Sequence, residues 1–167
     1  MSAMPARHYA PAPAAIAGWT VLAIGAVRLA LPQRDVRQIE LATDLKSSAA
    51  GESREIGWFL RKNGASWPAY SFDESLRLER PASAGRKLCV FMGERDDAVR
   101  GVLCNRVWSF EADADLRIEA VPGCMTGMRS PATGLAQFEG TAALVTDRAA
   151  LVAYLDLLLE PAHDEHG

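Results

Sequence analysis

The side chains that most often act as general bases, the histidines, stand only near the two ends of the chain. They are His8, His163 and His166. A general base must be held in a fixed position beside its substrate, and terminal segments rarely provide one. His163 and His166 flank Asp164-Glu165, a set that could bind a metal weakly, although we favour a solvated tail. The sequence therefore predicts no catalytic residue, no metal site and no cofactor.

No other motif supplies a reactive centre. The 167 residues contain neither a GxSxG nucleophile turn nor a glycine-rich phosphate loop. The acidic pairs Asp96-Asp97 and Asp113/Asp115 fall in predicted turns without apolar surroundings, so we assign them to solvent. We predict that the chain is not an enzyme.

The three cysteines are Cys89, Cys104 and Cys124, an odd number without CxxC spacing. Cys89 and Cys104 lie within apolar runs, where cysteine behaves as a small hydrophobic residue. We expect buried thiols in a reducing compartment, and a disulfide or a metal site is the alternative.

Composition and charge restrict the possible partners. Apolar residues make up 49% of the chain and charged residues 23%, and the formal net charge is -3. No cluster of Lys and Arg is present to bind nucleic acid or an acidic membrane surface. The apolar stretch 10–27 could be a signal peptide or an anchor, but Pro11, Pro13 and Arg28 fit neither well. We expect a tail over 1–15, then a strand from Trp19, with no nucleic-acid partner and no membrane insertion.

Strand patterns joined by tight turns occupy most of the chain. The proposed turns are Gly25-Ala26 between strands 19–25 and 26–32, Asn63-Gly64 between 55–62 and 65–72, and Glu139-Gly140 between 134–138 and 141–145. Glycine favours such turns because it tolerates the positive φ that they require. Pro68 cannot donate a ladder hydrogen bond, which predicts an edge strand or a bulge there.

The last element has a different period. Leu151, Tyr154 and Leu155 recur at helical spacing within 147–160, with Asp147 or Thr146 as the N-cap and Pro161 as the stop. The whole pattern predicts a mainly β (all-β) fold with a C-terminal helix. Two small barrels, over about 16–85 and 86–160, are expected between disordered tails 1–15 and 161–167, and a sandwich is the alternative.

Four segments, in order along the chain, resemble the CheW-like domain, the adaptor module of bacterial chemosensory arrays. WTVLAIGAVRLALPQRDVRQI resembles the paired first strands of that family. GWFLRKNGASWPAYSF resembles its Leu-Arg-Gly segment through Leu60, Arg61, Gly64 and Pro68, while Gly57 fits loosely. VRGVLCNRVWSF resembles the family's second-half strand, and GLAQFEGTAALVTDRAAL resembles its closing hairpin and helix.

The resemblance implies one CheW-like domain over 16–160, built from two linked five-stranded SH3-like barrels. It implies a cytoplasmic, non-catalytic scaffold for signal transduction in chemotaxis or twitching motility, with two protein partners. The regulatory domain of a CheA-type histidine kinase would pair with one surface. The helical hairpin tip of a chemoreceptor would enter a groove between the barrels.

The resemblance also marks residues. Those at positions linked to receptor binding, or to its local structure, are Val36, Gly57, Arg61, Gly64 and Gly101. Arg61 has the clearest physical reason, since a planar and always charged donor can anchor a polar receptor tip. An exposed strand residue without a partner is the alternative.

Departures from the family pattern leave a second function open. Ser71 and Asn105 stand where the family has Asp, and Lys62-Asn63 lengthen the turn before Gly64. These changes favour a divergent member, for example the adaptor of a pilus-motility or other alternative chemosensory system. The alternative is an interaction module that binds a related barrel domain or self-associates without engaging receptors.

Two of the four tryptophans are candidate anchors for a protein partner. Trp58 and Trp67 flank the Asn63-Gly64 turn, and we expect this pair to be the more exposed. Core packing is the alternative for every tryptophan.

Overall fold

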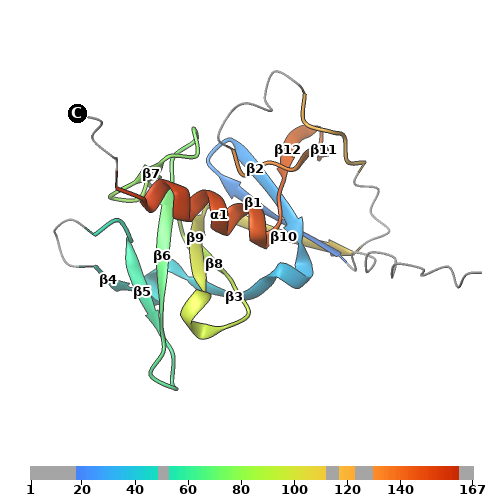
Figure 1. Cartoon of the computed structure of the whole chain (residues 1–167). Helices are drawn as coiled ribbons and strands as arrows, with labels where there is room; N and C mark the ends of the chain where they lie inside the picture. Colours follow the sequence, from blue (N-terminus) through green and yellow to red (C-terminus); the bar gives the residue numbers. More distant parts are fainter. Residues whose placement is uncertain (1–17, 49–52, 112–116, 123–129, 162–167) are drawn as a thin grey trace, which may run out of the picture.

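A computed structural model describes residues 18–48, 53–111, 117–122 and 130–161. Two strongly curled β-sheets lie side by side, and one helix crosses the junction between them (Figure 1). The predicted mainly β fold with a C-terminal helix is confirmed. The N-terminal tail, residues 162–167, all three histidines, Cys124 and the Asp113/Asp115 pair fall outside the described residues.

The first sheet has five strands in the order β10-β1-β2-β12-β11. Its strands are β1 (Gly18–Ile24), β2 (Val27–Pro32), β10 (Arg106–Glu111), β11 (Gly134–Phe138) and β12 (Thr141–Val145). Neighbouring strands are antiparallel except β12 and β2, which run parallel.

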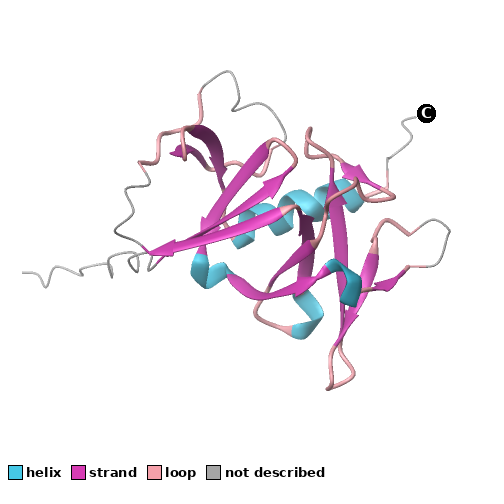
Figure 2. Ribbon diagram, turned by 180° about the vertical axis from the view of Figure 1, so that it is seen from behind, coloured by secondary structure: helices cyan, strands magenta, loops and turns pink. Residues whose placement is uncertain are grey.

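The second sheet has seven strands, in the order β3-β8-β9-β6-β5-β4 with β7 against β6. The strands are β3 (Val36–Leu41), β4 (Lys46–Ser47), β5 (Gly57–Leu60), β6 (Ser66–Phe72), β7 (Leu78–Glu79), β8 (Leu88–Met92) and β9 (Arg100–Cys104). The connections contain the 3-10 turns η1 (Gln33–Asp35), η2 (Ala42–Asp44) and η3 (Asp96–Ala98), drawn as short helical segments in Figure 2. The sheet thus has five main strands and two strands of two residues each.

The sheets do not follow the predicted halves of the chain, and the boundary near residue 85 is wrong. The seven-stranded sheet is continuous in sequence from β3 to β9, whereas the five-stranded sheet combines β1 and β2 with β10 to β12. The reason is long-range pairing: β1 lies between β2 and β10, with Val21 opposite Trp108. Local patterns predict strands, but they do not say which distant strand completes a sheet.

The three predicted hairpins are all present, with turns of different kinds. Gly25-Ala26 is a two-residue turn with positive φ at Gly25 alone, and Glu139-Gly140 has positive φ at both residues. At Asn63-Gly64 the loop has three residues instead of two, because the Arg61 amide donates to the carbonyl of Ala65 (2.8 Å). Only Gly64 is left-handed there (φ 87°), as in a hairpin loop closed by a glycine bulge.

Pro68 lies in a strand that is not at a sheet edge. β6 lies between β5 and β9, but its pairing with β9 begins only at Ala69. Pro68 itself is paired on one side, with Trp58 of β5. The missing N–H therefore falls where β6 has one partner strand, which keeps the ladder intact.

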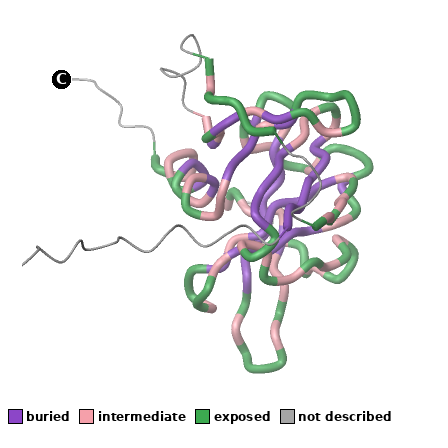
Figure 3. The backbone as a smooth tube through the Cα atoms, turned by 90° about the vertical axis from the view of Figure 1, so that its right-hand side faces the viewer, coloured by how far each residue is buried: buried purple, intermediate pink, exposed green. Residues whose placement is uncertain are grey.

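One apolar core is shared by both sheets and by the helix α1 (Arg148–Leu159). Its fully buried members include Leu22 and Leu29 from the first sheet and Phe72 and Val90 from the second. Leu151, Tyr154 and Leu155 of α1 cover this core on one side. The buried parts of the chain are purple in Figure 3. Asp147 caps the helix by accepting from the amide of Ala150 (2.8 Å), as predicted. No helix in the described ranges is long and apolar enough to span a membrane.

The chain passes from one sheet to the other at Asn105, between β9 and β10. The Asn105 amide donates to the carbonyl of Ala23 (2.8 Å), and its side-chain oxygen accepts from the amide of Gly25 (2.8 Å). The same oxygen accepts from Arg86, which is buried and also donates to the carbonyl of Phe72 (3.2 Å). Asn105 therefore connects the first turn, the crossover between the sheets and the buried Arg86 through its backbone and its side chain.

Replacing Asn105 by alanine is expected to destabilise the fold by about 1–3 kcal/mol, because it removes an acceptor from Arg86 and from the Gly25 amide. Asn105→Asp, which supplies a charged acceptor of the same shape, is the matched comparison and should be more stable than Asn105→Ala. Urea unfolding followed by circular dichroism measures both. Equal stability of Asn105→Ala and the wild type would contradict this account of the crossover.

Candidate protein-binding surface

The β5–β6 hairpin projects from the body of the molecule and ends in an exposed tip (Figures 1 and 3). Lys62, Asn63 and Gly64 form the tip, and Leu60 just before it is 47% exposed. A hollow of about 410 Å³ lies beside the hairpin and is lined by Gln38, Phe59, Leu60, Arg61, Lys62 and Asn63. An exposed leucine beside a row of polar donors is a suitable place for a protein partner.

Arg61 is held at the base of this tip. Its guanidinium lies over the ring of Trp67, 4.4 Å from the centroid, and it donates a hydrogen bond to the Gln38 side chain. Because stacking uses the face of the guanidinium, its edge keeps N–H donors for a partner. The structure thus gives Arg61 a fixed orientation, consistent with either a structural or a binding role.

Trp67 is not the exposed anchor that the sequence suggested, because its side chain is completely buried. It packs against Phe59 and Phe91, with ring centroids 5.9 and 5.3 Å away, in the interior of the seven-stranded sheet. Residues on both faces of β6 are covered, so the usual alternation of a half-buried strand is lost. Trp58 is half-buried and stays a candidate contact residue.

Asp96 joins the hairpin tip to the loop between β8 and β9. It accepts from Asn63 (3.0 Å) and forms an ion pair with Arg37 (2.7 Å), which lies over Trp67 as well. The hydrogen bond from Asn63, helped by the charges of Arg37 and Arg61, lowers the pKa of Asp96 despite slight desolvation. Asn63, one of the two extra turn residues, therefore supplies a contact that fixes the tip to the loop.

Two of the three predicted glycines, Gly57 and Gly101, stand where the neighbouring atoms leave no room for a side chain. A Cβ on Gly57 would lie 2.5 Å from the carbonyl oxygen of Lys46, and one on Gly101 would lie 2.5 Å from the Phe91 ring. Both are buried, while Gly64 is exposed with open space around it. Val36, at the start of β3, is half-buried against the shared core. All five predicted residues thus belong to the seven-stranded half of the fold, but only Arg61 and Gly64 lie on the projecting hairpin.

A second hollow, which the sequence did not reveal, runs between α1 and the β8–β9 loop. It encloses about 390 Å³ and is lined by Gly93, Glu94, Arg95, Ala98, Arg148, Ala149, Val152, Ala153 and Asp156. Small side chains form its floor and charged side chains its rim, where Arg148 pairs with Glu94 (2.9 Å). Ala149, Val152 and Ala153 recur at helical spacing, which could have indicated a second, shallow face of the helix.

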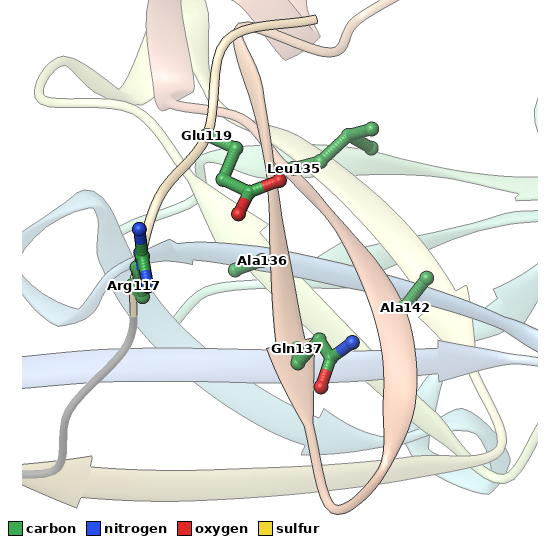
Figure 4. Close-up of a pocket in the computed structure, with 6 residues that line it drawn as sticks. All are labelled: Arg117, Glu119, Leu135, Ala136, Gln137 and Ala142. Carbon is green, nitrogen blue, oxygen red and sulfur yellow. The ribbon is translucent and has the colours of Figure 1, made fainter.

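A third hollow of about 500 Å³ lies beside the edge strand β11 (Figure 4). Arg117 and Glu119 line this hollow from a segment that is joined to β11 by a single bridge between Glu119 and Leu135. Gln137 lines it from β11 itself. The charged residues here are exposed and make no cluster with the hairpin surface.

The thiols in the described ranges are buried and free, as predicted for Cys89 and Cys104. Burial raises the pKa of Cys89 well above its usual value and that of Cys104 to about 12. Thiolates are therefore scarce at these positions at neutral pH. The described ranges also contain no group of three or more His, Cys, Asp or Glu side chains placed to hold a metal ion.

Two curled sheets that share a core and a covering helix define the class of fold, a mainly β domain of two sheets. The crystal structure of the scaffolding protein TtCheW from Thermoanaerobacter tengcongensis has this fold, with a TM-score of 0.58 and 12% sequence identity. The match covers 77% of this chain and 87% of that one. No family model matches the sequence, and a search of curated proteins gave no significant match. The fold is therefore CheW-like, carried by a divergent sequence.

A methyl group at position 101 should destabilise the protein. Because a Cβ there would meet both Phe91 and the Cys89 sulfur (2.7 Å), Gly101→Ala is expected to cost about 1–3 kcal/mol through overpacking. Thermal unfolding gives the value. A Gly101→Ala protein as stable as the wild type would show that the interior of β9 is looser than described.

The contact between the tip and the loop can be tested through Asp96. Asn63→Ala should raise the pKa of Asp96 towards its ordinary value, because it removes the first of the interactions that lower it. Since the folded-state pKa is lowered, this contact stabilises the fold above the unfolded pKa and is lost as the pH falls through the folded value. Carboxyl chemical shifts in a pH titration measure the change, with Lys62→Ala as the neighbouring control. An unchanged Asp96 titration in Asn63→Ala would contradict the assignment.

Proposed function

We propose that this chain is a non-catalytic adaptor that couples chemoreceptors to a CheA-type histidine kinase in a bacterial chemosensory array. The observation that carries the proposal is the CheW-like arrangement of two sheets and a helix, shared with a protein described as a scaffolding protein. The ordered family motifs in the sequence support it independently. Its place in the cell would be cytoplasmic, beside the receptors through its partners.

The receptor contact is proposed on one continuous surface, which we call the hairpin–loop–helix face. It consists of the end of the hairpin, residues Leu60–Gly64, together with the loop Gly93–Ala98 and the outer side of Arg148–Asp156. The loop lines the hollow beside α1, and the hydrogen bond from Asn63 to Asp96 (3.0 Å) joins it to the hairpin. Arg37 connects the loop to β3 by donating to the carbonyl of Glu94 (3.0 Å). Small side chains on the α1 side would let a receptor helix approach closely, while Arg61 and Lys62 supply donors for a polar tip.

The kinase contact is proposed elsewhere on the two sheets, where a related barrel of the kinase regulatory domain would pair with this fold. The hairpin–loop–helix face would then stay free for the receptor. This division of surfaces is what an adaptor requires, because both partners must bind at once.

The altered hairpin supports a second candidate, an interaction module that binds a related barrel or itself but no receptor. The residues that lengthen the turn, Lys62 and Asn63, are partly used within the molecule, since Asn63 donates to Asp96. A tip fixed in this way could present Arg61 differently from a shorter turn.

Leu60→Asp should weaken binding to a receptor signalling fragment from the same genome by roughly tenfold or more, because it places a charge where an exposed leucine would be buried. Binding to the kinase regulatory domain should stay the same. Ile118→Asp, an exposed apolar residue (46%) outside the face, is the matched control. Isothermal titration calorimetry with each partner measures the effects. Arg61→Glu is a second variant, to be interpreted with its stability because Arg61 also covers Trp67.

The outcomes separate the two candidates. Binding of the wild type to neither partner would overturn the adaptor function. Binding to the kinase domain alone, unchanged by Leu60→Asp and Arg61→Glu, would support the second candidate instead.

A further inference from the structure

Two tryptophans, one in each sheet, each carry a pair of arginines. In the seven-stranded sheet Arg37 and Arg61 lie over Trp67, 4.8 and 4.4 Å from the ring centroid. In the five-stranded sheet Arg28 and Arg106 lie over Trp108, at 5.1 and 4.8 Å. The same residue types therefore make the same kind of contact in both halves, which allows a direct comparison.

In the cluster of the seven-stranded sheet, one of the two arginines has a carboxylate partner within the molecule. Arg37 forms an ion pair with Asp96 (2.7 Å), and Arg61 donates to Gln38. Trp67 beneath them is fully buried. This cluster shows one partner that an arginine stacked on tryptophan takes, a carboxylate presented by a short helical turn.

The cluster in the five-stranded sheet has no such partner among the residues that the structure describes. Arg28 donates to the carbonyl of Gly25 (3.0 Å), and within the described ranges neither Arg28 nor Arg106 has a carboxylate within 4.0 Å. Arg106 is exposed and Arg28 half-buried. Since a guanidinium carries five donors, most N–H groups of this pair have no acceptor among the described residues.

The register of the strands explains how the two arginines come together. Ala23 of β1 is opposite Arg28 of β2 on one side and opposite Arg106 of β10 on the other. Ala23 between them is small and buried. Trp108, two residues further along β10, also contacts Phe138 edge-on at 5.3 Å, so an aromatic surface lies beside the two cations.

We propose that the Arg28–Trp108–Arg106 cluster is a docking site for an acidic segment of a partner protein. The carboxylates of this segment would accept from both arginines, as Asp96 does for Arg37, and its apolar side chains would cover Trp108 and Phe138. Arginine beside tryptophan is the combination that dominates binding energy in many interfaces. The net charge of -3 opposes long polyanions such as nucleic acid or an anionic membrane, whereas a short acidic segment meets only this local positive charge. The site lies on β1, β2 and β10, apart from the hairpin–loop–helix face, and does not depend on the adaptor function.

The test uses the full chain labelled with ¹⁵N and a short blocked peptide that alternates glutamate and leucine. We expect a saturable shift of the Trp108 indole N–H signal, assigned with Trp108→Phe, and an affinity that falls as salt is added. The double variant Arg28→Gln/Arg106→Gln should bind at least roughly tenfold more weakly. A peptide with glutamine in place of glutamate should lose binding to a similar degree.

The charge-matched control is Arg54→Gln/Arg77→Gln, two exposed arginines of the other half and outside the hairpin–loop–helix face, which should bind the acidic peptide like the wild type. The dispersed amide spectrum of each variant reports that it is folded. No saturable shift at Trp108, equal binding of the glutamine peptide, or unchanged affinity in the Arg28/Arg106 variant would each overturn the proposal. A Trp108 shift produced by inorganic phosphate or anionic vesicles, but not by the peptide, would also overturn it.

Discussion

The whole arrangement depends on one apolar core that neither sheet could complete alone. Leu151, Tyr154 and Leu155 of α1 fill the space between the sheets, and the Tyr154 hydroxyl donates to the carbonyl of Leu76 (2.5 Å). A small curled sheet has limited area to bury, so sharing a core stabilises both halves together. Because this core fixes α1, it also fixes the groove that α1 forms with the β8–β9 loop.

Arginines stacked on tryptophans form two of the charged clusters of this protein, one in each sheet. Around Trp67 one arginine is paired with Asp96, whereas around Trp108 neither arginine has a carboxylate partner in the described ranges, which is why we propose a docking site there. The difference is the position of one carboxylate, Asp96, which the hairpin tip holds through Asn63. A protein without an assembled reactive centre in its described residues can still present two chemically distinct surfaces from one motif.

Much of the local structure could be predicted from the residues. Glycine at Gly25, Gly64 and Gly140 marked the hairpins because positive φ costs glycine little, and the leucine spacing marked α1. The exposure of Trp67 could not be predicted, because a strand covered on both faces looks no different in sequence from one covered on a single face. The proposed docking surfaces could be predicted only in part. Arg61 was identified through its motif, but the groove along α1 was not, because α1 and the β8–β9 loop that line it are distant in sequence.

The sequence by itself determined the strands, the turns, the final helix and the motif order that resembles the CheW-like domain, because these depend on neighbouring residues. Tertiary structure alone decided that β1 pairs with β10, that Asn105 joins the sheets, and that Arg28 meets Arg106 across Ala23. Those contacts join residues about eighty positions apart, and the free energy that selects them comes from burial in the common core. The local sequence pattern does not indicate which distant residues pair.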